Sequence, residues 1–135
     1  KIAAVKSAAP DLFVNARTDT YWLSEGQDTF RRLDAYQQAG ADGVFVPGLS
    51  DPAAIGALVD RLDVPLNILY SPTGPTVRHL ADLGVRRVSL GSLLYRRALG
   101  AMLETVTEIA EGRSPRGSVP SYGEIVALGR PGAPS

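Results

Sequence analysis

Two charged side chains, Arg17 and Asp19, stand at the end of the first apolar run of the chain, residues 12–18. Side chains of a β-strand alternate between its two faces, so Asn15 shares a face with them. A guanidinium keeps its charge inside a protein and therefore needs an anionic partner. The partner is either Asp19, in a structural ion pair, or the carboxylate or phosphoryl group of a substrate. We favour the substrate, because buried ion pairs stabilise proteins poorly.

Polar side chains in two later apolar runs are candidates for contacting the same substrate. Asn67 needs a hydrogen-bond partner inside a buried strand, and either a substrate or a neighbouring strand can supply it. Ser89 precedes a strand-to-helix turn at Gly91, where backbone amides can receive an anion, although glycine there is more often just a turn. Arg87 begins its run, at the end away from a site, and is interpreted as structural. The predicted substrate-binding residues are Arg17, Asn15, Asp19, Asn67 and Ser89.

Residue types that carry acid–base or metal chemistry are scarce. The chain has no cysteine and one histidine, His79, which falls inside a predicted helix and is expected to be solvated. Among the acidic residues, only Asp19 stands at the carboxyl end of a predicted strand. No pair of carboxylates has the spacing of metal ligands. We therefore predict no catalytic residue and no metal ligand within these 135 residues.

The composition is that of an ordinary globular protein. Of the 135 residues, 44% are hydrophobic and 21% charged, and the formal net charge is zero. This balance favours neither nucleic acid nor an anionic membrane surface as a partner. No apolar run approaches the roughly 18 residues of a membrane span. We expect a cytoplasmic enzyme or a fragment of one.

Short apolar runs at residues 12–18, 43–47, 65–71 and 87–90 alternate with helical patterns at residues 27–39, 52–61, 76–83 and 93–111. This alternation predicts an α/β fold with a parallel sheet covered by helices. Four such β/α units are half of the eight in a TIM-type (β/α)₈ barrel of about 250 residues. The rival, a doubly wound sheet, usually carries a glycine-rich loop after its first strand, and this chain has none there.

Local signals mark where these elements begin and end. Gly40 and Gly84 stand where left-handed caps end helices, and Ser50-Asp51-Pro52 supplies a capping residue followed by proline at the first helical position. Residues 2–9 resemble the tail of a helix, which suggests that the first half of the barrel lies upstream. Residues 122–128 are predicted to form a short apolar turn, and residues 130–135 a disordered tail.

The last predicted helix is apolar over an unusually wide arc. Two adjacent stripes cover roughly 200° of it, against about 100° upward for a helix lying on one core. The stripes are Leu94, Ala98, Ala101, Met102, Thr105 and Ile109, and Leu99, Leu103, Val106 and Ala110, with Tyr95 between them. The charged residues Arg96, Arg97, Glu104, Glu108 and Glu111 fall in the remaining arc. We expect a partner subunit to cover one stripe, although residues 122–128 folding back is an alternative.

Four motifs together resemble the isocitrate lyase/phosphoenolpyruvate mutase family, most closely its phosphoenolpyruvate mutase-like bacterial members. They are Phe-Val-Asn-Ala-Arg-Thr-Asp at residues 13–19, Ala-Gly-Ala-Asp-Gly-Val-Phe-Val-Pro-Gly at 39–48, Val-Pro-Leu-Asn at 64–67 and Leu-Gly-Val-Arg-Arg-Val-Ser-Leu-Gly at 83–91. Any one alone is weak, but the combination at this spacing is specific. The resemblance covers residues 1–129, which match the carboxyl-terminal half of the family's (β/α)₈ barrel.

The resemblance implies a chemistry for the whole barrel. Family members bind Mg²⁺ and an α-oxo acid or its enolate, and they cleave or form a C–C bond or move a phosphoryl group. Arg17 matches the family arginine that grips the carboxylate or phosphoryl end of the substrate. Pro47 stands where methylisocitrate lyase-like members have a glutamate, which argues against that specificity. The family's metal-binding aspartates and mobile catalytic loop belong upstream, and its members exchange the last helix between paired barrels.

Two functions follow as expectations. The first is part of a Mg²⁺-dependent lyase or phosphomutase-type enzyme that acts on an oxo- or hydroxy-acid through an enolate-like intermediate. Its partners would be a small carboxylate or phosphonate substrate and a second copy of the chain, joined by exchange of the last helix. The alternative is a non-catalytic half-barrel that serves in binding or assembly, because the chain itself carries neither metal ligands nor a base.

Overall fold

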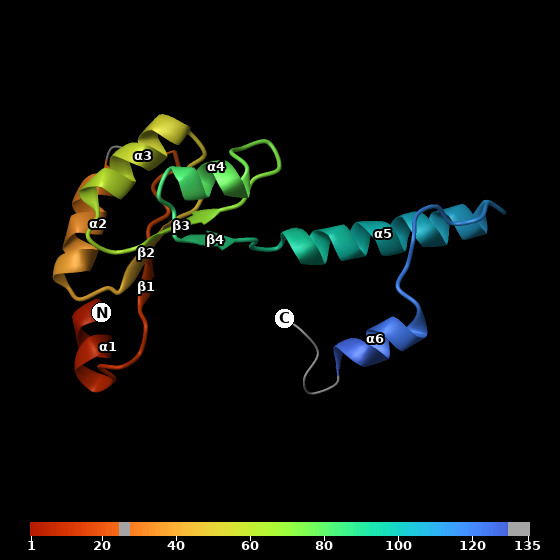
Figure 1. Ribbon diagram of the computed structural model, residues 1–135, viewed down its shortest axis with the longest axis horizontal. Helices are drawn as coiled ribbons and strands as arrows, with labels where there is room; N and C mark the ends of the chain where they lie inside the picture. Colours follow the sequence, from red (N-terminus) through yellow and green to blue (C-terminus); the bar gives the residue numbers. More distant parts are fainter. Residues whose placement is uncertain (25–27, 130–135) are drawn as a thin grey trace. The chain divides into compact units, whose positions relative to one another are not determined.

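Two compact units make up the chain, Lys1–Ser92 and Leu93–Ser135. Their structure is a computed structural model that describes residues 1–24 and 28–129. The first unit contains four strands and four helices in alternation, and the second contains two helices (Figure 1). The predicted tail at residues 130–135 lies outside the described residues, as does the predicted helix start at residue 27.

The first unit is built on a four-stranded parallel sheet with the strand order β1-β2-β3-β4. Its strands are β1 (Asn15–Arg17), β2 (Gly43–Val46), β3 (Leu66–Leu69) and β4 (Arg87–Ser89). Its helices are α1 (Ile2–Ala8), α2 (Thr29–Gln38), α3 (Pro52–Arg61) and α4 (Val77–Asp82). The predicted α/β alternation with a parallel sheet is therefore confirmed, and so is the helix at the start of the chain.

The strands are shorter than predicted, and the segment ahead of β1 also bonds to other parts of the chain. Ahead of β1, the Val14 amide donates to the Asp42 carboxylate at 2.7 Å, and the Leu12 carbonyl accepts from Lys6 Nζ at 3.1 Å. Lys6 Nζ also lies 3.0 Å from Asp42 Oδ2. These bonds join α1 to the segment before β1 and to the turn before β2, so residues 12–14 do not extend the strand.

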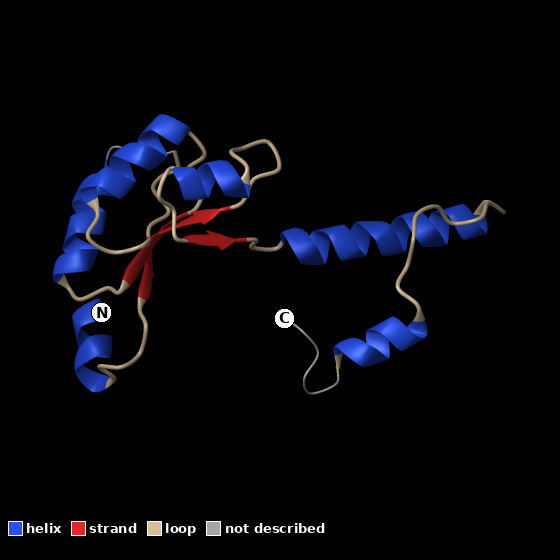
Figure 2. Cartoon of the chain, in the orientation of Figure 1, coloured by secondary structure: helices blue, strands red, loops and turns tan. Residues whose placement is uncertain are grey.

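The core lies between the helices and one face of the sheet, and α2, α3 and α4 cover that face (Figure 2). The sheet contributes Val44, Val46, Leu66 and Ile68, and the helices contribute Leu33, Ile55, Leu58 and Leu80, all at most 2% exposed. Burying an aliphatic side chain of this size contributes about 1.5–3 kcal/mol. These residues occur at alternate strand positions, as expected for one covered face.

The local signals in the turns are confirmed. Gly40 has φ +89° and Gly84 has φ +91°, the left-handed conformation expected after α2 and α4. A Cβ on Gly84 would lie 2.7 Å from the Val59 side chain, so this turn also needs glycine for space. Asp51 caps α3 by accepting from the Ala54 amide at 2.8 Å, with Pro52 in the first turn. His79 is exposed on α4, as expected.

The second unit holds α5 (Leu93–Ala110) and α6 (Tyr122–Leu128). The predicted turn at residues 122–128 is wrong, because this segment is a helix. Ser121 and Glu124 form a reciprocal capping box that pairs the free backbone groups at its start. Both apolar stripes of α5 are largely exposed within this chain, and α6 leaves its own apolar side chains exposed. The fold-back alternative for covering α5 is therefore not realised here.

One residue in the charged arc of α5 is buried. Glu108 is 2% exposed, because the loop after the helix folds over it. Its carboxylate accepts from Arg113 Nη1 at 3.0 Å, from Arg116 Nε at 2.6 Å and from the Arg116 amide at 3.0 Å. Gly112, at φ +72°, allows the chain to turn back into this arrangement. No described helix combines the length and apolar character of a membrane span.

Candidate functional site

Arg17 is the last residue of β1, on the sheet face that carries no covering helix in this unit. Its Nε donates to Asp19 Oδ1 at 2.7 Å, and its guanidinium carbon lies 5.5 Å from the centre of the Phe45 ring. The register pairs Arg17 with Phe45 on the neighbouring strand, so both project from the same face. The predicted separation of faces is confirmed, since Ala16 and Thr18 are buried on the helix side.

The two interpretations of Arg17 are compatible in the structure. The ion pair with Asp19 is present, but it uses only Nε, at one edge of the guanidinium. The pair is not buried within this chain, because the side chains are 51% and 43% exposed. Asp19 and Phe45 therefore restrain the guanidinium of a residue that lines the cavity described next, and no other ion pair of Arg17 occurs among the described residues.

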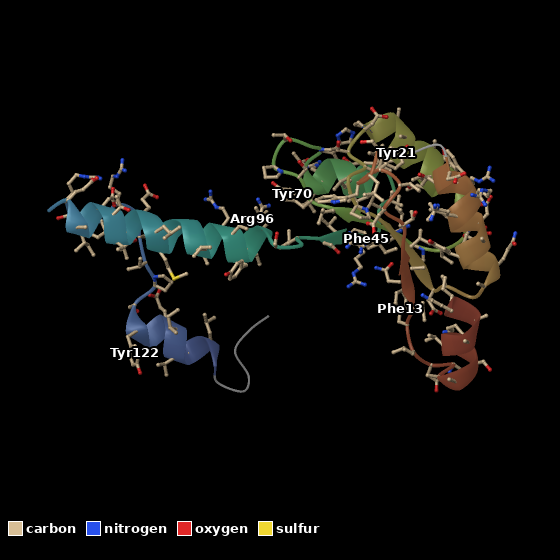
Figure 3. All side chains as sticks on the ribbon, turned by 180° about the vertical axis from the view of Figure 1, so that it is seen from behind. Phe13, Tyr21, Phe45, Tyr70, Arg96 and Tyr122 are labelled. Carbon is tan, nitrogen blue, oxygen red and sulfur yellow. The ribbon has the colours of Figure 1, made fainter. Side chains whose placement is uncertain are left out.

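A concave region of about 600 Å³ lies along this face and includes the carboxyl ends of the strands. Its walls combine two arginines and two serines with several apolar side chains. It is lined by Arg17, Trp22, Phe45, Pro47, Leu69, Arg87, Val88, Ser89, Leu90, Gly91 and Ser92. A cation surrounded by apolar walls at the carboxyl ends of parallel strands is an arrangement suited to an organic anion. Figure 3 shows the side chains of the sheet, with Phe45 labelled.

Asn67 and Ser89 are hydrogen-bonded to each other. Asn67 Nδ2 donates to Ser89 Oγ at 3.0 Å, and Ser89 Oγ donates to Asn67 Oδ1 at 3.1 Å. The neighbouring strand therefore supplies the partner that the 2% exposed Asn67 requires. Ser89 still lines the cavity beside Arg17, so this pair presents a hydroxyl whose orientation the amide holds.

Asn15 is separated from the other predicted site residues. It lines a smaller cavity toward the amino ends of the strands, together with Phe13, Gly43, Asn67 and Arg87 among others. A Cβ on Gly43 would lie 3.3 Å from both Asn15 Oδ1 and the Phe13 ring, so the side chains crowd this end of the sheet. The structure thus brings Arg17, with its partner Asp19, and Ser89 to one cavity. Asn15 and Asn67 line the smaller one, and Asn67 is bonded to Ser89.

Sequence reasoning missed two residues of the cavity, Arg87 and Trp22. Arg87 was interpreted as structural because it begins its strand. The register places it in the same row across the sheet as Phe45 and Asn67, and it lines the cavity of Arg17. Trp22 follows Arg17 by five residues and is the single tryptophan of the sequence, so its type and position could have marked it.

The described residues do not form a Mg²⁺ site. No group of three or more histidine, cysteine, aspartate or glutamate side chains lies close enough to hold a metal ion in the part of the chain that the structure describes. The carboxylate of Asp19 is already bonded to the cavity residue Arg17. These residues therefore do not fit a metal centre by themselves.

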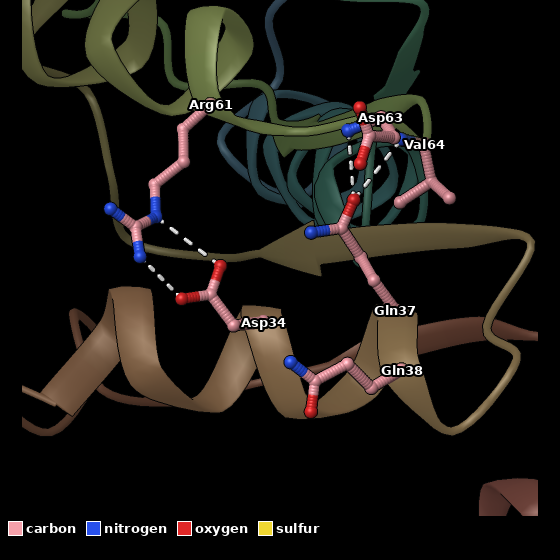
Figure 4. Close-up of a pocket in the computed structure, with 6 residues that line it drawn as sticks. All are labelled: Asp34, Gln37, Gln38, Arg61, Asp63 and Val64. Atoms are coloured by element: carbon pink, nitrogen blue, oxygen red, sulfur yellow. Dashed lines mark hydrogen bonds and ion pairs between the residues drawn. The ribbon is translucent and has the colours of Figure 1, made fainter.

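A hollow between α2 and α3, shown in Figure 4, contains polar groups with structural roles. Arg61 and Asp34 form a two-bonded ion pair, and hydrogen bonding to Arg61 holds the pKa of the Asp34 carboxyl below its usual value. Gln37 Oε1 accepts from the amides of Asp63, at 2.8 Å, and Val64, at 3.3 Å. These bonds join α2 to the end of α3 and to the turn that leads to β3.

Comparison with known proteins identifies the family to which this geometry belongs. The family model described as phosphoenolpyruvate phosphomutase matches residues 1–110. An uncharacterized protein of Mycobacterium tuberculosis is 43% identical over 130 residues, which are 94% of this chain and 50% of that protein. A 2-methylisocitrate lyase of Bacillus subtilis is 40% identical over 83 residues, covering 61% of this chain and 27% of that enzyme.

A solved structure extends the similarity to the fold. A crystal structure from Burkholderia cenocepacia J2315, which carries a provisional lyase/mutase name, has a TM-score of 0.83 at 34% identity. It matches 96% of this chain, and this chain covers 51% of it. The four β/α units therefore correspond to half of a TIM-type barrel, and the chain spans about half the length of its first relatives. The chain belongs to the phosphoenolpyruvate phosphomutase family, within the isocitrate lyase/phosphoenolpyruvate mutase superfamily.

Proposed function

We propose that this chain is the carboxyl-terminal half of the barrel of a Mg²⁺-dependent lyase or phosphomutase-type enzyme. Its substrate is an oxo- or hydroxy-acid that reacts through an enolate-like intermediate. The observation that carries the proposal is the guanidinium of Arg17, which contacts Asp19 and Phe45 and lines the cavity at the carboxyl end of the sheet. Family membership supports the lyase or mutase class of reaction.

In this proposal Arg17 binds the carboxylate or phosphoryl end of the substrate. Charge-assisted hydrogen bonds from a planar guanidinium fix both the position and the orientation of such a group. Asp19 acts as a positioning residue, because its bond to Nε limits rotation of the guanidinium. Ser89 lines the same cavity, and its hydroxyl would exchange its bond to Asn67 Oδ1 for a neutral hydrogen bond to this ligand. A substrate held at a remote anionic end keeps its reacting carbon in a constant place.

The remaining parts of the proposal concern groups outside the described cavity. Mg²⁺ ligands and the general base are assigned to the half of the barrel that completes this one, since the described residues offer no metal cluster. The exposed apolar stripes of α5 support a homo-oligomer formed by exchange of this helix. A cytoplasmic location belongs to the same proposal. We refer to this chain joined to its complementary four β/α units as the closed barrel.

Turnover assays on the closed barrel test the proposed function. A panel of oxo- and hydroxy-dicarboxylates and phosphonates is assayed with Mg²⁺ and again after EDTA treatment. We expect C–C bond cleavage or phosphoryl migration with at least one member of the panel, abolished by EDTA and restored by added Mg²⁺. A folded closed barrel that turns over none of these acids would contradict the proposal.

A non-catalytic half-barrel is the second candidate, favoured by the absence of a metal cluster in the described residues. The two functions differ in what accompanies the chain. Genomic sequence that encodes an in-frame half-barrel with paired aspartates ahead of residue 1 supports the enzyme. An initiation codon directly before residue 1 supports the binding or assembly module.

A further inference from the structure

Trp22 is an exposed aromatic residue in the turn that follows the Arg17–Asp19 pair. The side chain is 60% exposed, yet it lines the same cavity as Arg17. Large aromatic side chains contribute a large apolar area, and they are enriched where proteins bind ligands and partners. Phe45, Leu69 and Pro47 line the cavity as well, so the indole stands beside other apolar walls.

The backbone around Trp22 is held by specific contacts. The Leu23 amide donates to the Asp19 carbonyl at 2.8 Å, and the Ser24 amide donates to the Tyr21 carbonyl at 3.3 Å. These bonds close a turn directly after the Arg17–Asp19 pair. Ser24 completes it with φ +61°, a conformation that non-glycine residues rarely adopt. The turn therefore has a defined geometry relative to Arg17.

Gly48 fixes the other side of this turn. It follows β2 with φ +86°, and a Cβ at this position would lie 3.0 Å from the Trp22 nitrogen and 3.1 Å from its Cα. The backbone of Trp22 thus packs directly on the Pro47–Gly48 corner. Two strand ends, β1 and β2, together determine where the indole stands, and both of them contribute walls to the cavity.

We infer that Trp22 is a specificity-determining residue that contacts the apolar part of an anionic ligand bound by Arg17. The ligand class is a carboxylate or phosphonate that carries an apolar substituent next to its charged end. In this arrangement the guanidinium of Arg17 binds the anionic group of the ligand, and the indole of Trp22 packs against its apolar substituent. This inference rests on the anion-binding role proposed for Arg17, and it adds the chemical class that the cavity accepts.

A pair of non-reacting probes with the same anionic head tests the inference: methylphosphonate and phenylphosphonate. Binding of each to the closed barrel is measured by isothermal titration calorimetry. The parent protein should bind phenylphosphonate about tenfold more tightly, which corresponds to about 1.4 kcal/mol. Trp22→Ala should remove that preference and leave methylphosphonate binding within about twofold, while Trp22→Phe should retain most of it.

A matched control is Phe30→Ala, because Phe30 is also a partly exposed aromatic residue but lines a different hollow, with Arg61. It should change neither affinity. Subtracting the fluorescence of Trp22→Phe from that of the parent isolates the emission of this indole, which phenylphosphonate should perturb more than methylphosphonate. Circular dichroism on each variant confirms folding, so that a loss of affinity reports on the site.

The outcomes separate this inference from the proposed function. Equal affinities of the parent for both probes, equal weakening of both by Trp22→Ala, or binding of neither probe would overturn the inference. If the parent binds both phosphonates with equal affinity and Arg17→Ala binds neither, the anion-binding role of Arg17 is supported and Trp22 has no role in specificity. A preference for phenylphosphonate that depends on Trp22, in a closed barrel that shows no turnover, would support the inference. It would contradict only the proposed catalytic function.

Discussion

Arg17 and Asp19 are joined by a hydrogen bond of 2.7 Å between Nε and Oδ1, across a single intervening residue. The bond uses only Nε of the guanidinium, and Arg17 lines the same cavity as Ser89. An ion pair and an anion-binding site are usually treated as rival explanations for an arginine on a sheet face. Here the pair is half-exposed and orients the cation, so the same contact serves the binding role proposed for Arg17.

Replacing Arg17 tests that binding role directly. In the closed barrel, Arg17→Ala should lower kcat/KM by at least about 100-fold, because it removes a charge-assisted bidentate contact to the substrate. Arg17→Lys should also be poor, since lysine lacks the planar fork. Steady-state kinetics and thermal melts are compared for each variant. Activity that survives while the melting temperature collapses would show that Arg17 is structural instead.

Asp19→Asn separates the orientation of Arg17 from its charge. Asparagine has nearly the same shape but accepts a weaker, neutral hydrogen bond from Nε, so the guanidinium should be less restrained. We expect KM to rise by about tenfold, with a smaller change in kcat, for substrates that Arg17 binds. Stability should change little, because half-exposed ion pairs contribute about 0–1 kcal/mol. An unaltered KM would contradict the positioning role of Asp19.

Gly48→Ala should destabilise the fold by about 1–3 kcal/mol, because alanine is strained at φ +86° and its Cβ would meet the backbone of Trp22. Chemical denaturation measures the loss. Gly100→Ala is the matched control, since Gly100 lies within α5 and its Cβ would meet nothing within 4 Å. Gly100→Ala should leave the free energy of unfolding unchanged or raise it by about 0.5–1 kcal/mol. Equal effects of Gly48→Ala and Gly100→Ala on stability would contradict the close packing of Gly48 against the backbone of Trp22.

Leu103→Glu or Val106→Glu should split the oligomer proposed for α5. Leu103 is 62% exposed and Val106 is 65% exposed within this chain, so a partner subunit must cover them if the helix is exchanged. Light scattering after size exclusion reports the mass of each variant. Arg97→Glu, in the charged arc of the same helix, is the control and should keep the parent mass. A parent protein that is monomeric at micromolar concentration would defeat the proposal.

Acid should release the loop that folds over Glu108. The amide and guanidinium of Arg116 hold the pKa of this carboxyl below its usual value, as does the bond from Arg113. A carboxyl with a lowered native pKa contributes stability above its unfolded pKa of about 4.3 and loses it as the pH falls through the native value. NMR shifts of the Arg116 amide should therefore move as the pH falls below the unfolded pKa of this carboxyl. In Glu108→Gln that transition should be absent; its persistence would exclude Glu108 as the cause.

Sequence alone determined the features that depend on neighbours along the chain. Alternation within a strand separated Arg17 from Ala16 and Thr18, because successive side chains point to opposite faces whatever the strand pairs with. The ends of helices were likewise predicted at Gly40, Gly84 and Asp51, since caps are made by residues within one turn of the helix end. The number and parallel direction of the strands followed from the alternation of apolar runs and helices.

Tertiary structure decided the features that depend on contacts between distant segments. Strand register chose Ser89 as the partner of Asn67 and placed Arg87 beside the cavity of Arg17. The place of Trp22 depends on Gly48, which is distant in the sequence and adjacent only after β1 and β2 pair. Glu108 is buried because Arg113 and Arg116 turn back over it. The local sequence around each of these residues is compatible with several partners. Hydrogen bonding and packing between segments that are distant in the sequence decide which partner is used, and the periodicity of the chain does not encode it.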